Sequence, residues 1–186
     1  KRAGLAVPDS VMLIVSPGCC GRNTSVLSSM RAYQDRFYYL LMDETDIVTG
    51  RHLKKIPKAV AEICEGLKKK PSVVMICITC VDALLGTDMG RVCHKAEEYA
   101  GVPVRPCYMY ALTREGRKPP MVHVRQSVYS LLEPKKKKGN VVNLLGYFSP
   151  LTDDCELYDL LHGAGVKTIH EISRCKDYAQ YQTMSE

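Results

Sequence analysis

The chain has 186 residues, of which 46% are hydrophobic and 25% charged, and its formal net charge is +6. This composition is typical of a globular protein, and no apolar run approaches the roughly 18–20 residues of a membrane-spanning helix. The length is enough for one hydrophobic core, or for one domain and part of a second. We therefore exclude a membrane-spanning protein and expect no membrane partner.

Much of the positive charge lies in two short lysine clusters, at residues 68–70 and 135–138. Each cluster falls where an element is expected to end, which favours a solvated helix end or linker over a site for an acidic partner. No aromatic residues alternate with these lysines, as they would in a protein that binds single strands. We therefore predict no nucleic-acid partner.

Nine cysteines are many for a chain of this length, and the odd number argues against a closed set of disulfides. Several of them fall inside apolar segments, where a thiol packs as a small hydrophobic side chain. We therefore predict a protein of a reducing cytoplasm, in an anaerobe.

Strands and helices alternate along the first part of the chain. Short apolar runs predict strands, and apolar residues three or four positions apart predict helices. In chain order, the predictions are a strand at 11–15, a helix at 23–32, a strand at 37–41, a loop at 43–50, a helix at 53–67, a strand at 72–78, a helix at 89–100, a strand at 102–104 and a helix at 121–132.

The segment EPKKKKGN, at 133–140, predicts a linker, and the alternation restarts after it. The later predictions are a strand at 141–145, a helix at 153–162, a strand at 166–170 and a helix from about 177. Alternation of this kind predicts an α/β fold of three layers, with a parallel sheet between helices on both faces. We expect a first α/β domain over 1–134 and the truncated beginning of a second over 139–186, as in a piece of a longer protein.

Cysteines follow several of the predicted strands. Cys19 and Cys20 come after the first strand, Cys80 after the third and Cys107 after the fourth. In parallel sheets, ligands bind at the carboxyl ends of the strands, and thiolates gathered there suit an iron–sulfur cluster or zinc. On residue types alone, cysteines that pack in the core remain the stronger interpretation.

Other interpretations of this region stay open. Cys77 and Cys80 have the C-x-x-C spacing of a redox dithiol, although Cys77 falls inside a predicted strand. Asp82 and Asp88 are expected to cap helices. The chain contains no GxxxxGK[ST] or GxGxxG motif, so no nucleotide site is predicted.

An ordered set of motifs resembles the nitrogenase component 1-type oxidoreductase family, which includes nitrogenase subunits and nitrogenase-like reductases. The motifs are PGCC at 17–20, ETDIVTG at 44–50, a segment at 80–88 that ends in GTD, and NLLG at 143–146. The resemblance covers nearly the whole chain and implies a nitrogenase component 1-like fold. Cys20 and Cys80 match the family's second and third cluster-ligating cysteines. No cysteine occurs in residues 1–15, where the first would lie.

The resemblance also implies a function. Cys20 and Cys80 would bind an iron–sulfur cluster of the 4Fe–4S type, beside a turn formed by Gly18, Cys19 and Gly21, whose glycines would take positive φ. The full-length protein would be an oxidoreductase subunit that relays electrons through the cluster to a bound substrate or cofactor. The isolated piece would be inactive, and no catalytic residue is assigned.

Two partners are implied: a homologous or identical component 1 subunit, and an ATP-dependent iron–sulfur reductase. The alternative function is a non-catalytic scaffold or carrier on which a metallocofactor is assembled. The family includes proteins of both kinds, and the motifs do not separate them.

Overall fold

The computed structural model describes residues 2–21, 33, 35–108 and 119–186. A four-stranded parallel sheet with strand order β2-β1-β3-β4 forms its centre. The strands are β1 (Val11–Ser16), β2 (Phe37–Leu41), β3 (Val74–Ile78) and β4 (Val104–Tyr108). The helices around them are η1 (Arg2–Leu5), α2 (Glu44–Thr49), α3 (Arg51–Gly66), α4 (Cys80–Leu84), α5 (Met89–Ala100) and α6 (Pro120–Tyr129).

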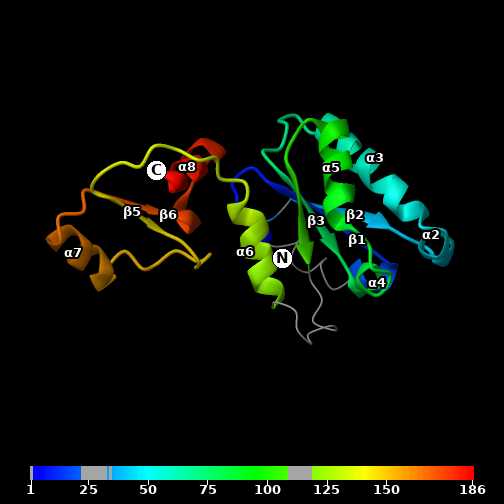
Figure 1. Cartoon of the computed structure of the whole chain (residues 1–186), viewed down its shortest axis with the longest axis horizontal. Coiled ribbons are helices and arrows are strands. Elements are labelled where there is room, and N and C mark those ends of the chain that lie inside the picture. The colour runs from blue at the N-terminus through cyan, green and yellow to red at the C-terminus, as the bar shows by residue number, and fades with distance from the viewer. Residues whose placement is uncertain (1, 22–32, 34, 109–118) are drawn as a thin grey trace.

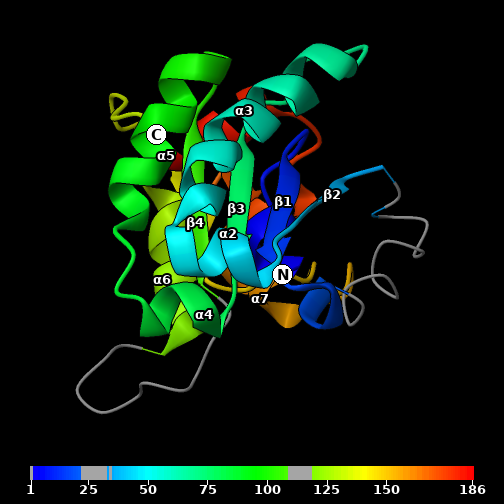
Figure 2. The same ribbon diagram turned by 90° about the vertical axis from the view of Figure 1, so that its right-hand side faces the viewer.

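Helices cover both faces of this sheet (Figures 1 and 2). Successive side chains of β1 point to opposite faces. Leu13 and Val15 belong to the core beneath α3 and α5, whereas Met12 and Ile14 belong to the core that α6 covers. Every residue of β1 and β3 is buried, as expected for strands with helices on both sides. The predicted α/β fold class, with a parallel sheet between two helical layers, is confirmed.

Some element boundaries differ from the predictions. The segment at 43–50, predicted as a loop, contains α2, so that prediction was wrong. The fourth strand begins at Val104 and not at 102, because the chain first turns through Gly101, which has a positive φ. The helix predicted at 23–32 lies outside the described residues.

The C-terminal part forms a second, two-stranded parallel sheet. Its elements are β5 (Val141–Leu144), α7 (Glu156–Gly163), β6 (Thr168–Glu171), η3 (Ile172–Arg174), α8 (Tyr178–Gln182) and η4 (Thr183–Ser185). Residues 133–138 of the linker form neither helix nor strand. The division into domains at this linker stays a prediction.

The C-terminal part packs against α6. Tyr181 is fully buried, and its hydroxyl donates to the carbonyl of Val128. The side-chain amide of Gln182 donates to the Leu131 carbonyl at 2.8 Å and accepts from the Glu133 N–H at 2.9 Å. These contacts join α8 to the same core that lies beneath α6.

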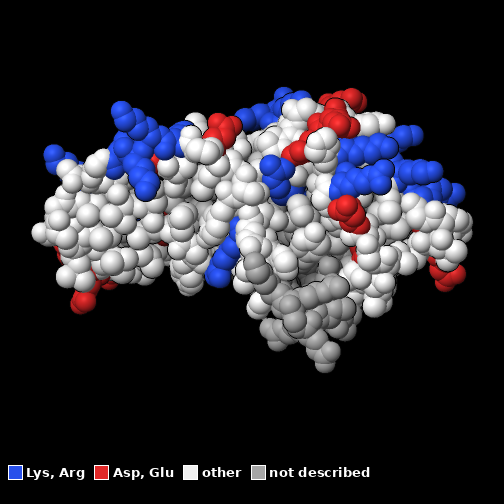
Figure 3. Space-filling view, in the orientation of Figure 1, with Lys and Arg blue, Asp and Glu red and all other residues white. Residues whose placement is uncertain are grey.

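Basic side chains gather over α3 and α5 and over the linker (Figure 3). Several of the clustered lysines are paired with carboxylates. Lys69 lies 2.9 Å from Asp9, and Lys138 lies 2.5 Å from Glu186. Within the described ranges, no helix combines the length and the apolar character that crossing a bilayer requires.

Candidate metal centre

The strand order of the sheet reverses between β1 and β3. The chain leaves β1 toward β2 on one side, and leaves β3 toward β4 on the other. Val15 pairs with Ile78 in register, so the two strands end side by side. Open α/β sheets bind ligands at such a reversal point. The turn at 17–21 and the start of α4 both leave the sheet here.

Cys20 lies in a helical turn at 18–21 that directly follows β1. Its N–H donates to the carbonyl of Pro17 at 3.1 Å, which closes the turn. Cys19 is exposed, Cys20 is half-buried, and their sulfur atoms are 3.9 Å apart. A disulfide bond requires about 2.05 Å, so these two sulfurs are not bonded to each other.

Gly18 and Gly21 lie in the same helical turn, so the expected positive φ at these two glycines was wrong. Residues 18–21 are helical, and helical residues have negative φ. The two glycines differ in the space around them. A Cβ at Gly21 would lie 3.3 Å from Ser16 Oγ, whereas a Cβ at Gly18 would meet no atom within 4 Å. Gly21 is therefore the position where the turn approaches the strand end closely.

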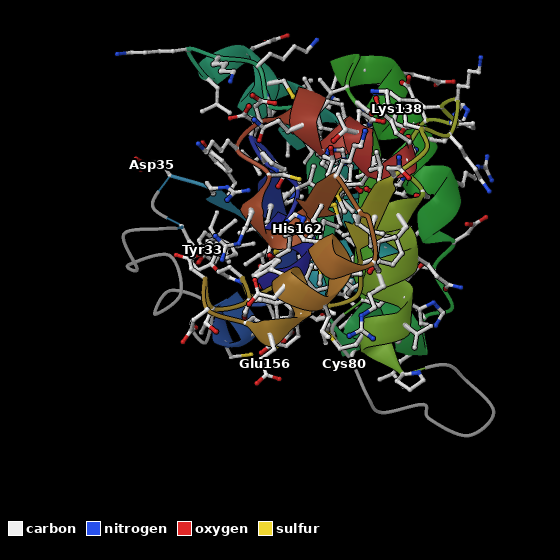
Figure 4. All side chains as sticks on the ribbon, turned by 90° about the vertical axis from the view of Figure 1, so that its left-hand side faces the viewer. Tyr33, Asp35, Cys80, Lys138, Glu156 and His162 are labelled. Atoms are coloured by element: carbon white, nitrogen blue, oxygen red, sulfur yellow. The ribbon has the colours of Figure 1, made fainter. Side chains whose placement is uncertain are left out.

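Cys80 is the first residue of α4, one residue after Thr79 at the end of the buried strand β3. Its side chain is half-buried. Because β1 and β3 are neighbours, the fold brings the turn that carries Cys20 and the helix that carries Cys80 to one edge of the sheet. Figure 4 shows Cys80 at one end of the molecule, far from Lys138 in the linker. The metal-ligand role of the two cysteines stays a prediction.

Buried hydroxyl groups precede both cysteine positions. Ser16 Oγ and Thr79 Oγ1 are buried and make no hydrogen bond within the described part of the chain. Thiolates and inorganic sulfide accept hydrogen bonds, so unpaired donors at this edge fit a sulfur-rich metal group. No set of three or more His, Cys, Asp or Glu side chains among residues 2–21, 33, 35–108 and 119–186 could hold a metal ion. Cys20 and Cys80 could therefore supply only part of a cluster's ligands.

Most of the other cysteines in the first part of the chain pack in the cores. Cys64, Cys77, Cys93 and Cys107 are all buried. Burial raises the pKa of the Cys93 thiol to about 12, and burial also raises the pKa of Cys64. The sequence left open whether Cys107 faces this edge; β4 continues to Tyr108 and places Cys107 in the core of the sheet. Cys77 lies inside β3 and is 1% exposed, which argues against a dithiol with Cys80.

The acidic segment after β2 forms a capped helix with a buried carboxylate. The Asp43 side chain accepts from the Asp46 N–H at 2.7 Å, and the two residues form a capping box. Asp46 is 1% exposed and accepts from Lys55 Nζ and Arg51 Nε, each at 2.7 Å. The hydrogen bond from Lys55, followed by that from Arg51, lowers the pKa of Asp46 to about 2.

A buried pair of His52 and Asp82 links this segment to α4, and the sequence analysis missed it. His52 Nε2 lies 3.0 Å from Asp82 Oδ1, and both side chains are fully buried. A signal for this position existed in the sequence: His52 precedes Ile56 by four residues and Val60 by eight, which places it on the buried face of α3.

The expected helix caps had different outcomes. Asp88 caps α5, since its carboxylate accepts from the Arg91 N–H at 3.1 Å. Asp82 does not cap a helix, because it is the third residue of α4, where its carboxylate faces His52.

Comparison with known proteins places the chain in a family. The model of the nitrogenase component 1 type oxidoreductases matches residues 1–186. The chain belongs to this family. A relative, the nitrogenase iron-molybdenum cofactor biosynthesis protein NifE of Rhizobium meliloti (strain 1021), is 32% identical over 67% of this chain and 26% of its own length. NifE of Rhodobacter capsulatus is 28% identical over 94% of this chain and 38% of its own length.

Solved structures agree with this assignment. The structure of nitrogenase Cp1 at pH 6.5 has a TM-score of 0.65 and 20% identity, and covers 94% of this chain and 39% of its own. At this identity the likeness shows the shared fold. The chain therefore spans less than half the length of the component 1-type proteins it matches.

Proposed function

We propose that this chain is the cluster-side part of a scaffold or carrier protein for metallocofactor assembly, which holds a metal–sulfur cluster as its cargo. The observation that carries the proposal is the edge between β1 and β3, where the turn that carries Cys20 and the helix that carries Cys80 both leave the sheet. The NifE relatives are cofactor biosynthesis proteins, and their identity to this chain supports the scaffold over the electron-relay function. The cysteine-rich composition suits a reducing cytoplasm.

Several residues at this edge would each contribute to binding the cluster. Cys20 and Cys80 would supply thiolate ligands, and the hydroxyls of Ser16 and Thr79 would donate to sulfur. Gly21 would let the turn lie against Ser16. A 4Fe–4S cluster takes four cysteine ligands, so a second, homologous or identical subunit would complete the coordination.

Anaerobic reconstitution with iron and sulfide tests the ligand assignment. The protein, expressed from its complete reading frame, should develop broad charge-transfer absorption, and Cys20→Ala and Cys80→Ala should each lose most of it. Cys155→Ala, which alters a cysteine in the C-terminal part, is the matched control and should keep it. Equal absorption in all of these variants would exclude Cys20 and Cys80 as ligands.

The electron-relay function is the second candidate, and it rests on the family's oxidoreductase members. A scaffold should pass its iron and sulfide to an apo-acceptor protein on mixing, without ATP. A relay should keep its cluster and reduce a substrate only when an ATP-dependent iron–sulfur reductase is present. Retention of the cluster with ATP-dependent turnover would overturn the scaffold proposal.

A further inference from the structure

We propose that His52 and Asp82 are positioning residues for Cys80, because their buried contact fixes the short helix that carries this thiol. This role rests on the proposed function of Cys80 as a cluster ligand, and it adds a contact between two side chains that the sequence analysis did not pair. The contact joins three elements of the carboxyl edge: the acidic segment with α2, the start of α3, and α4.

His52 is held from both sides of its ring. Its Nδ1 lies 2.9 Å from the carbonyl oxygen of Asp46, and its Nε2 lies 3.0 Å from Asp82 Oδ1. A carbonyl oxygen only accepts hydrogen bonds, so Nδ1 carries a hydrogen and donates. Nε2, on the other side of the ring, faces the carboxyl group of Asp82. This arrangement fixes both the ring orientation and the position of Asp82.

Asp82 in turn holds the segment that follows Cys80. Its Oδ1 also accepts from Thr87 Oγ1 at 3.1 Å, and its backbone carbonyl accepts from the Thr87 N–H at 3.0 Å. Both bonds join Asp82, in α4, to Thr87, in the short connection between α4 and α5. The position of Asp82 therefore helps to determine the path of the chain that follows α4.

The helix α4 has few other supports. It has five residues, and the side chain of its N-cap residue, Thr79, makes no capping hydrogen bond. Helices this short are not stable alone, so tertiary contacts must hold them. Val81 packs against the core beneath α3 and α5, and the His52 contact is the second anchor. Loss of His52 would leave Asp82 with only the Thr87 hydroxyl as a side-chain partner, which would weaken the attachment of α4.

The remaining oxygen of Asp82 adds an independent observation. Oδ2 is buried and has no hydrogen-bond partner in the described ranges. Burying a carboxylate is costly unless the group is paired and hydrogen-bonded. His52 is thus the main compensation for Asp82, and the pair acts as one unit.

Alkylation of the metal-free protein, expressed from its complete reading frame, tests this role. Each cysteine is quantified by mass spectrometry after iodoacetamide treatment. In His52→Ala, Cys80 should react about tenfold faster, the change expected from losing about 1.4 kcal/mol of local stability. Cys20 and the buried Cys93 should keep their rates. In His52→Gln, whose side-chain amide can donate to Asp82, Cys80 should regain most of its slow rate.

A matched control is His94→Ala, which alters an exposed histidine of α5 and should leave all three rates unchanged. An unchanged Cys80 rate in His52→Ala would overturn the positioning role. Equal acceleration of Cys20, Cys80 and Cys93 would overturn it too, since it would show a purely global effect on stability. The ligand role of Cys80 is judged separately, by the reconstitution of the unaltered protein and Cys80→Ala.

Discussion

At the scale of single residues, buried charge at the carboxyl edge is compensated by specific partners. Asp46 and Asp82 are each 1% exposed, and each has at least one cationic or imidazole partner within 3.0 Å. Buried carboxylates require such partners because removal from water disfavours the charged form. The two aspartates therefore have structural partners, and the thiols of Cys20 and Cys80 remain the candidate metal ligands.

The pKa of Asp46 gives a pH prediction. The Lys55 and Arg51 contacts lower this pKa from 3.8 to about 2, so the folded state holds the ionised carboxylate more tightly than the unfolded chain does. The stabilisation is fully present above about pH 4. It is lost as the pH falls toward the folded-state pKa. Urea unfolding from pH 2 to 7 should show Asp46→Asn less stable than the unaltered protein above pH 4, with the difference closing toward pH 2.

The control for this measurement is Asp154→Asn, which removes an exposed carboxylate from the C-terminal part. Its stability should follow that of the unaltered protein at every pH. A difference between Asp46→Asn and the unaltered protein that persists at pH 2 would show that the ion pairs are not its source.

The sequence identified part of this residue-scale picture. The placement of Cys20 and Cys80 after neighbouring strands followed from motif order, because parallel strands bring their carboxyl ends to one edge. His52 could not be assigned a partner, since Asp82 is 30 positions away and only the packing of α3 against the sheet brings them together. The position of Cys107 stayed open because the predicted strand ended four residues too early.

At the scale of elements, one glycine connects two helices. Gly50 ends α2 and precedes α3, with φ of 65°, and its N–H donates to the Ile47 carbonyl at 3.3 Å. A left-handed residue allows the chain to leave α2 and start α3 without an intervening loop. The sequence TG was interpreted as the end of a loop, although Asp43 and Gly50 are the two cap signals of a short helix. Such a helix has too few residues to show apolar periodicity.

Gly50→Ala should therefore destabilise the protein by about 1–2 kcal/mol, since an alanine in this conformation is strained. Chemical denaturation measures the change. Gly66→Ala, at the last position of the same α3, is the matched control, because a Cβ at Gly66 would meet no atom within 4 Å. It should be neutral or stabilising by up to about 1 kcal/mol. Equal losses in the two variants would argue against the φ explanation.

At the scale of the whole molecule, the C-terminal part shares a core with the first sheet. Ile172, Tyr181 and Met184 from the C-terminal part are buried with Val124 and Val128 of α6. The sequence predicted the linker and the restart of the strand–helix alternation. It could not predict this shared core, because the apolar residues of α8 and η4 are too few to show which face they cover. The shared core predicts that the two parts unfold together.

Tyr181→Ala tests this coupling. Removal of a fully buried aromatic side chain should cost about 3–5 kcal/mol, and Tyr181→Phe, which loses only the bond to Val128, about 1 kcal/mol. Tyr147→Ala, at a side chain that is 64% exposed, should stay within about 0.5 kcal/mol. Denaturation followed by circular dichroism should give one transition for the unaltered protein. Two separate transitions would contradict the shared core.

The register between β1 and β3 has a consequence for how such sites are found in other chains. Ladder hydrogen bonds align the two strand ends, so residues inserted or deleted in the crossover connections leave the two strand ends side by side. The count of residues between Cys20 and Cys80 is therefore a poor search pattern. A better pattern asks for a thiol within a few positions after each of two adjacent buried strands, whatever the length of chain that separates them.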